Sequence, residues 1–150
     1  MSLIGLDMQF LDRESSPEEY YQEAQSLEAN EVYDSAGQMY RLSGMLGCMD
    51  DASRCVYLLM ARHGEYLKAA DGLWSIGEYR LAYQQYENAE NKPGIIRCRL
   101  LRGDTWQTIM EECGVGEVEI RKAVFARPND DLLQAYIRAY LPRIEEVQAD

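Results

Sequence analysis

The chain has 150 residues, of which 47% are hydrophobic and 27% are charged, and its formal net charge is −11. This composition is typical of one folded globular domain and excludes a disordered or fibrous chain. The negative charge disfavours nucleic acid and anionic membrane surfaces as partners, and no apolar run reaches the roughly 18 residues of a membrane span. We therefore expect a cytoplasmic protein whose acidic field favours a basic segment of another protein.

The apolar residues recur with a helical period and never alternate strictly, so every predicted element is a helix. Residues 1–15 form an N-terminal segment that is flexible or packs on the rest, and residues 16–150 form a single domain. The first helix has Ser16 as its N-cap, Pro17 at its first position and Glu19 three residues after the cap. It runs to about Ala29.

A second predicted helix follows residues 30–31 and ends at Ser43, before two glycines that allow a left-handed helix terminus. A third begins at residues 50–51, and glycines mark the boundaries of the helices that follow. These boundary glycines are Gly64, Gly77, Gly94, Gly103, Gly114 and Gly116. Residues 128–130 cap a last helix near 129–141, which closes the domain at its C-terminal end. The chain is therefore predicted to fold into eight or nine short antiparallel helices that depend on packing against their neighbours.

An internal repeat is the strongest signal in the sequence. An aromatic residue is followed by alanine three positions later in four helices, and two of these continue to a second tyrosine and a small residue. The predicted structural positions of this repeat are Ala24, Tyr33, Ala36, Tyr40, Ala69, Tyr79, Ala82, Tyr86 and Ala89. Alanine at a helix crossing lets two backbones approach, and the aromatic rings fill the gaps on either side.

Residues 77–93 resemble the second helix of a tetratricopeptide repeat, which reads Gly-x-Tyr-x-x-Ala-x-x-x-Tyr-x-x-Ala before a proline. Gly77, Tyr79, Ala82, Tyr86, Ala89 and Pro93 occupy these positions. Ala70 stands twelve residues before Ala82, as Ala24 stands twelve before Ala36, and the resemblance covers about residues 17–113. It implies an all-α fold, an α-α superhelix in the form of a right-handed solenoid.

The repeat is irregular, because Tyr66 and Tyr79 are only 13 residues apart and the 34-residue phasing of the family is lost. Such irregular versions are similar to the helical tails of intraflagellar-transport and vesicle-coat proteins and to repeat regions of large helicases. The spacings allow two ways of pairing the helices. The resemblance implies a non-catalytic scaffold that binds a partner peptide or helix in a groove.

A second interpretation is a structural section of a longer solenoid, with an enzyme as a distant third. The longer solenoid predicts self-association through exposed apolar end faces. The candidate end-face residues are Leu132, Leu133 and Tyr136, or Ile4, Leu6 and Phe10.

Residues suited to catalysis or metal binding do not form a recognised pattern. The single histidine, His63, precedes a helix-ending glycine, and the four cysteines have no metal-ligand spacing. The acid pairs at 111–112 and 130–131 suit helix surfaces and N-caps, and no glycine-rich phosphate loop is present. We therefore expect no enzymatic activity, no cofactor and no metal.

The candidate partner-binding residues are Arg97, Arg99, Arg102, Tyr57 and Tyr83. Arg99 and Arg102 share a helix face, where they could bind a partner's carboxylates or pair with acids on neighbouring helices. Tyrosines outside the repeat are interface anchors when they are exposed.

Overall fold

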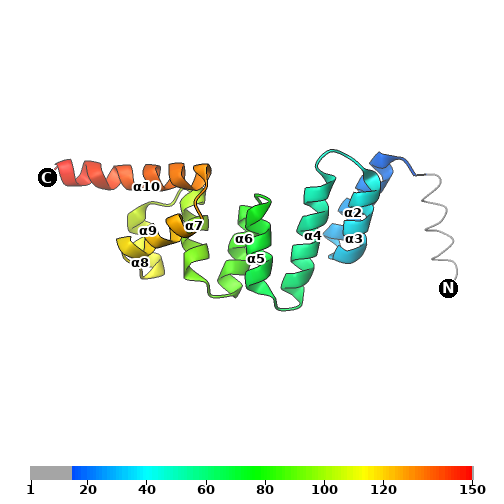
Figure 1. The fold of residues 1–150 in the computed structure, drawn as a ribbon, viewed down its shortest axis with the longest axis horizontal. Helices are drawn as coiled ribbons and strands as arrows, with labels where there is room; N and C mark the ends of the chain where they lie inside the picture. The colour runs from blue at the N-terminus through cyan, green and yellow to red at the C-terminus, as the bar shows by residue number, and fades with distance from the viewer. Residues whose placement is uncertain (1–14, 150) are drawn as a thin grey trace. The chain divides into compact units, whose positions relative to one another are not determined.

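The computed structural model describes the backbone of residues 15–149 and the side chains of residues 15–142, and every regular element within that range is an α-helix. The helices are α2 (Pro17–Ala29), α3 (Tyr33–Ser43), α4 (Cys48–Arg62), α5 (Tyr66–Ser75), α6 (Tyr79–Asn88), α7 (Lys92–Arg102), α8 (Trp106–Cys113), α9 (Glu117–Ala126) and α10 (Asp130–Ala149) (Figure 1). The predicted all-α class and the number of helices are confirmed for these residues. The predicted end-face residues Ile4, Leu6 and Phe10 lie outside them.

The helices group into two compact units. Among the described residues, the first unit runs to residue 65 and includes α2, α3 and α4. The second unit begins at residue 66 and includes α5 to α10. Each unit has its own buried side chains.

The start of α2 follows its sequence signals. The Ser16 hydroxyl accepts a hydrogen bond from the Glu19 amide at 3.2 Å, and the Glu19 carboxylate accepts one from the Ser16 amide at 3.4 Å. With Pro17 at the first helical position, this reciprocal capping box satisfies two donors that a helix end leaves open. The predicted boundaries of this helix are confirmed.

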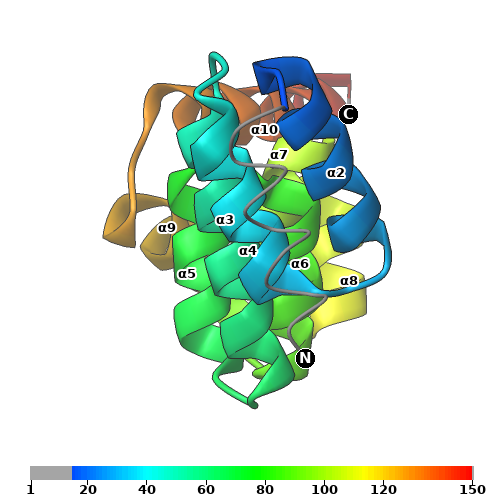
Figure 2. The same cartoon turned by 90° about the vertical axis from the view of Figure 1, so that its right-hand side faces the viewer.

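The first unit is built around α3, which packs against both α2 and α4. Figure 2 shows α2 and α3 lying side by side. Ala24 and Ala36 are both fully buried, as the repeat predicts for residues at a helix crossing. Tyr40 is buried beside them. The ring of Tyr21 packs edge-on against that of Tyr40, with 5.4 Å between the ring centres. Tyr33 is half-buried at the edge of this cluster.

A network of charged side chains joins the three helices of the first unit. Arg54 on α4 binds Glu28 on α2 at 2.6 Å and Asp51 at 2.9 Å, and the Tyr40 hydroxyl donates to Glu28 at 2.6 Å. Burial would raise the pKa of Glu28, but the hydrogen bonds from Arg54 and Tyr40 outweigh it and hold that pKa below its ordinary value of 4.5. Glu28 is therefore ionised at neutral pH and links all three helices.

Replacing Glu28 by glutamine is expected to make the first unit less sensitive to acid. A carboxyl with a lowered pKa in the folded state stabilises the fold above its unfolded pKa and loses that contribution as the pH falls through its folded pKa. Glu28→Gln should therefore lower the free energy of unfolding by about 1–2 kcal/mol at pH 7 and by less at a pH below 4.5, where the carboxyl of the unfolded chain takes up a proton. Urea unfolding followed by circular dichroism measures this difference, and an equal loss at both pH values would contradict it.

In the second unit, α5 and α6 form a helical hairpin, as α2 and α3 do in the first unit. Ala70 and Ala82 are fully buried in these two contacting helices, as Ala24 and Ala36 are in α2 and α3. Both alanine pairs, which stand twelve residues apart, therefore lie in helices that contact each other. Ala69 is also buried, and Tyr79 and Ala89 are half-buried.

Tyr86 occupies the place in this hairpin that Tyr40 has in the first. Its hydroxyl donates to Asp71 on α5 at 2.7 Å, and Asp71 also pairs with Arg127 at 3.1 Å. The Arg97 guanidinium lies 5.7 Å from the centre of the Tyr86 ring, much as Arg54 lies 5.8 Å from that of Tyr40. Burial and the bond to Asp71 raise the pKa of Tyr86 to about 12, so its hydroxyl stays protonated.

Gly94 does not end a helix, although the sequence predicts a boundary there. It lies in the first turn of α7, where the Asn91 side chain caps its amide at 2.9 Å. It is buried, and a Cβ atom at this position would overlap the Tyr86 ring. Glycine is therefore required for close packing of α7 on α6.

The C-terminal half of the second unit departs from consecutive pairing. Helix α7 contacts α6 on one side and α8, α9 and α10 on the other, so it forms the centre of this unit. Figure 1 shows α10 lying across the end of α7. The predicted capping helix at 129–141 is present but longer, because α10 continues through Pro142 to Ala149.

Enlarging the buried alanines should destabilise each hairpin. Ala36→Leu in the first unit and Ala82→Leu in the second are each expected to cost about 1–3 kcal/mol, because both alanines are fully buried and a larger side chain must displace its neighbours. Thermal unfolding measures both, and an unchanged midpoint for either variant would contradict the packing described here. Ala29→Leu, at an exposed position in the last turn of α2, is the matched control.

Candidate functional site

The residues that the sequence offers for catalysis or metal binding do not form a reactive group in the described part of the chain. His63 is exposed at the C-terminal end of α4, and no three His, Cys, Asp or Glu side chains among the described residues are placed to hold a metal. Glu112 pairs with Arg99, and Glu111 accepts a hydrogen bond from Gln107 at 3.2 Å. None of the described helices is long and apolar enough to cross a membrane.

The four cysteines are free thiols, and Cys48, Cys55 and Cys98 are buried. Burial raises the pKa of both the Cys55 and the Cys98 thiol to about 12. Both thiols are therefore protonated at neutral pH and are weak nucleophiles.

The predicted arginine cluster separates into two buried residues and one accessible residue. Arg97 is only 4% exposed, donates to the Ala123 carbonyl at 3.3 Å and lies 5.7 Å from the Trp74 ring centre. Arg99 is 6% exposed and binds Asp104 at 2.7 Å, with further bonds to Glu112 and Cys113. Both guanidinium groups are held inside the second unit, so a partner would not reach them without rearrangement.

Arg102, by contrast, has a side chain that is 51% exposed. Its Nε and Nη2 atoms donate to Asp104 at 3.2 and 2.6 Å, and its guanidinium lies 5.2 Å from the centre of the Tyr83 ring. The structure therefore brings together two of the predicted binding residues, Arg102 and Tyr83. Tyr57 is half-buried on α4 in the first unit and is not part of this group.

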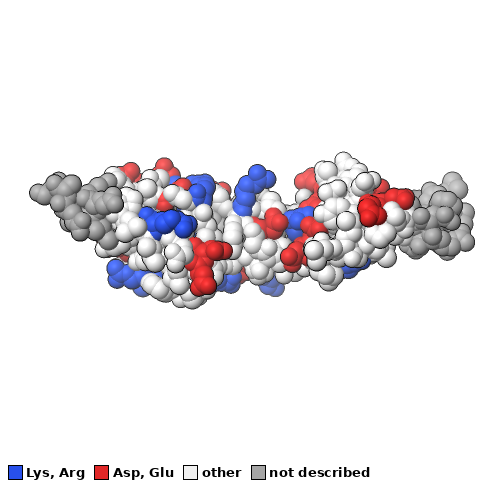
Figure 3. Space-filling view, turned by 90° about the horizontal axis from the view of Figure 1, so that it is seen from above, with Lys and Arg blue, Asp and Glu red and all other residues white. Residues whose placement is uncertain are grey.

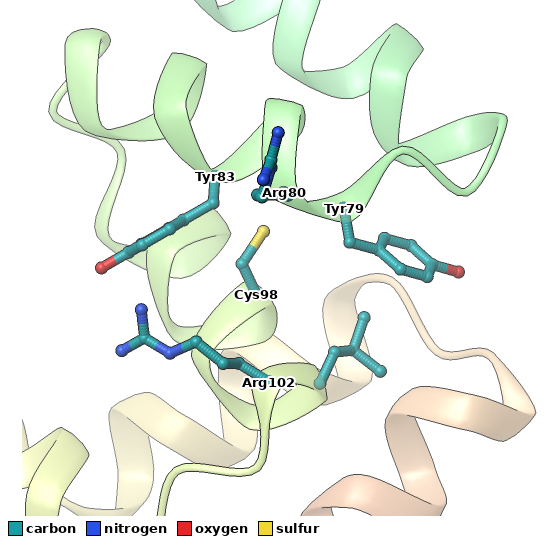
Figure 4. A pocket seen from close by; sticks show the side chains of 6 residues that line it. Tyr79, Arg80, Tyr83, Cys98 and Arg102 are labelled. Carbon is teal, nitrogen blue, oxygen red and sulfur yellow. The ribbon is translucent and has the colours of Figure 1, made fainter.

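Arg102 and Tyr83 line a surface hollow of about 430 Å³ between α6 and α7. The lining of this α6–α7 hollow consists of Tyr79, Arg80, Tyr83, Cys98, Leu101 and Arg102. Figure 4 shows the rings of Tyr79 and Tyr83 on opposite sides of the Cys98 sulfur, with the Arg102 guanidinium beside Tyr83. The hollow thus has an apolar floor, aromatic walls and two arginines.

Both aromatic walls are held in place by neighbouring side chains. Tyr79 packs edge-on against Trp74 at 4.8 Å between ring centres, and Trp74 is only 7% exposed. Tyr83 lies under the Arg102 guanidinium, which Asp104 holds through an ion pair at 2.6 Å. Side chains that are already ordered lose little conformational entropy when a ligand binds.

Arg80 and Leu101 are part of the hollow but are absent from the sequence-based set of candidates. Arg80 is three residues from Tyr83 on the same helix face, and Leu101 precedes Arg102. The spacing of Arg80 and Tyr83 is the sequence feature from which Arg80 could have been predicted as a neighbour of Tyr83. The approach of α6 to α7, which makes the hollow, could not be read from either helix alone.

A second, smaller hollow of about 260 Å³ lies between α7 and α9. Lys92, which the sequence places beside the arginine cluster, lies here with Lys122 and Glu119, at the opposite end of α7 from Arg102. The surface drawn in Figure 3 carries basic and acidic side chains interleaved with one another, so the net charge of −11 does not describe each local site.

No protein-family model matches this chain, and comparisons with curated proteins and with solved structures found no significant similarity. The tetratricopeptide resemblance therefore remains an interpretation of the sequence.

Proposed function

We propose that this chain is a non-catalytic, tetratricopeptide-like scaffold of the cytoplasm that holds a segment of another protein against its second unit. The observation that carries the proposal is the α6–α7 hollow, with its ordered tyrosine walls and exposed arginine. Aromatic residues and arginine are the side chains that contribute most energy at protein interfaces. The four free thiols fit a reducing compartment.

The chemistry of the hollow favours binding over catalysis. Its one potential nucleophile is the Cys98 thiol, which is 5% exposed and whose pKa burial raises to about 12. A reactive cysteine requires a lowered pKa and an accessible sulfur. Cys98 therefore serves as part of the apolar floor.

Selection from a library of random peptides displayed on phage tests the proposal without knowledge of the partner. Peptides enriched on the wild-type chain should lose binding to the double variant Tyr83→Ala, Leu101→Ala, which removes one wall and part of the floor. Tyr66→Ala is the matched control, because Tyr66 is 38% exposed on α5 and does not line the hollow. Enriched peptides that bind the double variant as well as the wild type would contradict the proposal.

A section of a longer solenoid is the second candidate, and one observation favours it. Ile137, Tyr140 and Leu141 form a stripe on α10 with exposed fractions of 47%, 37% and 48%. These residues replace the predicted end face, since Leu132 is buried and Leu133 and Tyr136 are half-buried. If this stripe packs on further helices, Ile137→Asp should abolish any concentration-dependent association seen by analytical ultracentrifugation. A monomer at all concentrations would remove support for this candidate.

A further inference from the structure

The lining of the α6–α7 hollow has a charge opposite to that of the whole chain. The chain contains 26 acidic residues and 15 basic ones, yet the described residues that line the hollow include two arginines and no aspartate or glutamate. A ligand seated there meets the local groups at contact distance, whereas charges further away than about 8 Å are screened at physiological salt. The local charges therefore decide which segment fits.

The two arginines of the hollow differ in how far their charges are already paired. Arg80 is exposed and forms no ion pair with any described residue, so its charge is available to a ligand. Arg102 is partly neutralised by Asp104, but its Nη1 atom has no hydrogen bond within the described part of the chain. Together they offer one free cation and one further donor beside the apolar floor.

The size of the hollow limits what can enter it. Its volume of about 430 Å³ lies at the small end of the roughly 300–1,000 Å³ range of ligand sites. One or two large apolar side chains of an extended or helical segment fill such a space. The rings of Tyr79 and Tyr83 flank this space on opposite sides of the Cys98 sulfur (Figure 4).

We propose that the α6–α7 hollow binds an acidic–apolar protein segment, in which one or two large apolar side chains enter between Tyr79 and Tyr83 and flanking carboxylates pair with Arg80 and Arg102. This proposal rests on the proposed scaffold function and names the partner chemistry of the same site. It differs from the basic partner that the net charge alone favours.

Fluorescence anisotropy with three labelled synthetic peptides tests the proposal on the full chain. The first has a central leucine–phenylalanine pair flanked on each side by two aspartates, the second has lysines in place of the aspartates, and the third has alanines in place of the apolar pair. We expect only the first to bind well, and we expect its affinity to fall as salt rises from about 0.05 to 0.15 M.

Substitutions locate the binding site. Arg80→Glu should weaken binding of the aspartate-flanked peptide about fivefold or more, because it replaces an attraction by a repulsion. Arg138→Glu is the matched control, since Arg138 is an exposed arginine of α10 in the same unit and makes the same change in net charge. Equal effects of the two substitutions would overturn the pairing with Arg80.

The outcomes separate this proposal from the scaffold function on which it rests. If the lysine-flanked peptide binds better and loses binding in Tyr83→Ala, the hollow is a docking site but the acidic class is wrong. If none of the three peptides binds while phage-selected peptides still depend on Tyr83, the acidic–apolar class is likewise overturned and the scaffold function stands. If phage-selected peptides also ignore Tyr83, both proposals fail.

Discussion

Gly94→Ala is expected to lower the free energy of unfolding of the second unit by about 3 kcal/mol. The added methyl group would overlap the near side of the Tyr86 ring, which is fully buried and cannot turn away because its hydroxyl is bound to Asp71. Relief of the overlap requires α7 to move from α6, and α7 is also the helix on which α9 and α10 pack. Both tryptophans, Trp74 and Trp106, belong to this unit, so urea unfolding followed by tryptophan fluorescence reports its stability.

Gly37→Ala is the matched control for this effect. Gly37 is also a buried glycine inside a helix, but a Cβ atom there would lie 3.6 Å from the Cβ of Cys55, an ordinary contact distance. Since alanine favours a helix more than glycine does, this variant should be unchanged or more stable by up to about 1 kcal/mol, measured by circular dichroism. If Gly94→Ala lowers the free energy of unfolding no more than Gly37→Ala does, the close contact of Gly94 with Tyr86 is contradicted.

Arg54→Ala should have the second large effect, a loss of about 2–4 kcal/mol in the first unit. Arg54 neutralises two carboxylates, and the side chains of Arg54, Glu28 and Asp51 are only 17–19% exposed. Removal of the guanidinium leaves two partly buried negative charges close together, which costs more than the ion pair itself contributes. The measurement is urea unfolding followed by circular dichroism, since this unit has no tryptophan.

Two further variants distinguish the network from a general effect of charge. Arg41→Ala removes an exposed arginine from α3 and should change stability by no more than about 0.5 kcal/mol. Arg54→Lys keeps the charge but not the planar fork that binds Glu28 through two nitrogens, so its stability should lie between those of wild type and Arg54→Ala. An Arg54→Ala variant as stable as Arg41→Ala would contradict the network.

The elements with local signals could be predicted from the sequence. The capping box of Ser16 and Glu19 acts within one helical turn, and the start of α2 follows from it. The alanine and tyrosine spacing predicts the buried hairpin positions because a helix fixes which residues share a face. The burial of Ala24, Ala36, Ala82 and Tyr86 agrees with that pattern.

The features that depend on how closely one helix approaches another could not be predicted. Gly94 has the sequence context of a helix boundary, and only the approach of Tyr86 shows why a helix carries glycine there. Arg97 and Arg99 have the sequence context of solvated arginines. Both are nevertheless buried by α8, α9 and the turn that follows α7. The α6–α7 hollow depends on the same long-range packing, which is why Arg80 was missed.

Chemical-shift mapping of the isotope-labelled chain with a phage-selected peptide tests the central claim, that the second unit holds a partner segment at the α6–α7 hollow. We expect the largest shifts of backbone amide signals on α6 and α7, around Tyr83 and Leu101, with α2 and α3 unchanged. Shifts confined to other helices, or none at about 1 mM peptide, where even weak binding of about −4 kcal/mol would register, would contradict the claim.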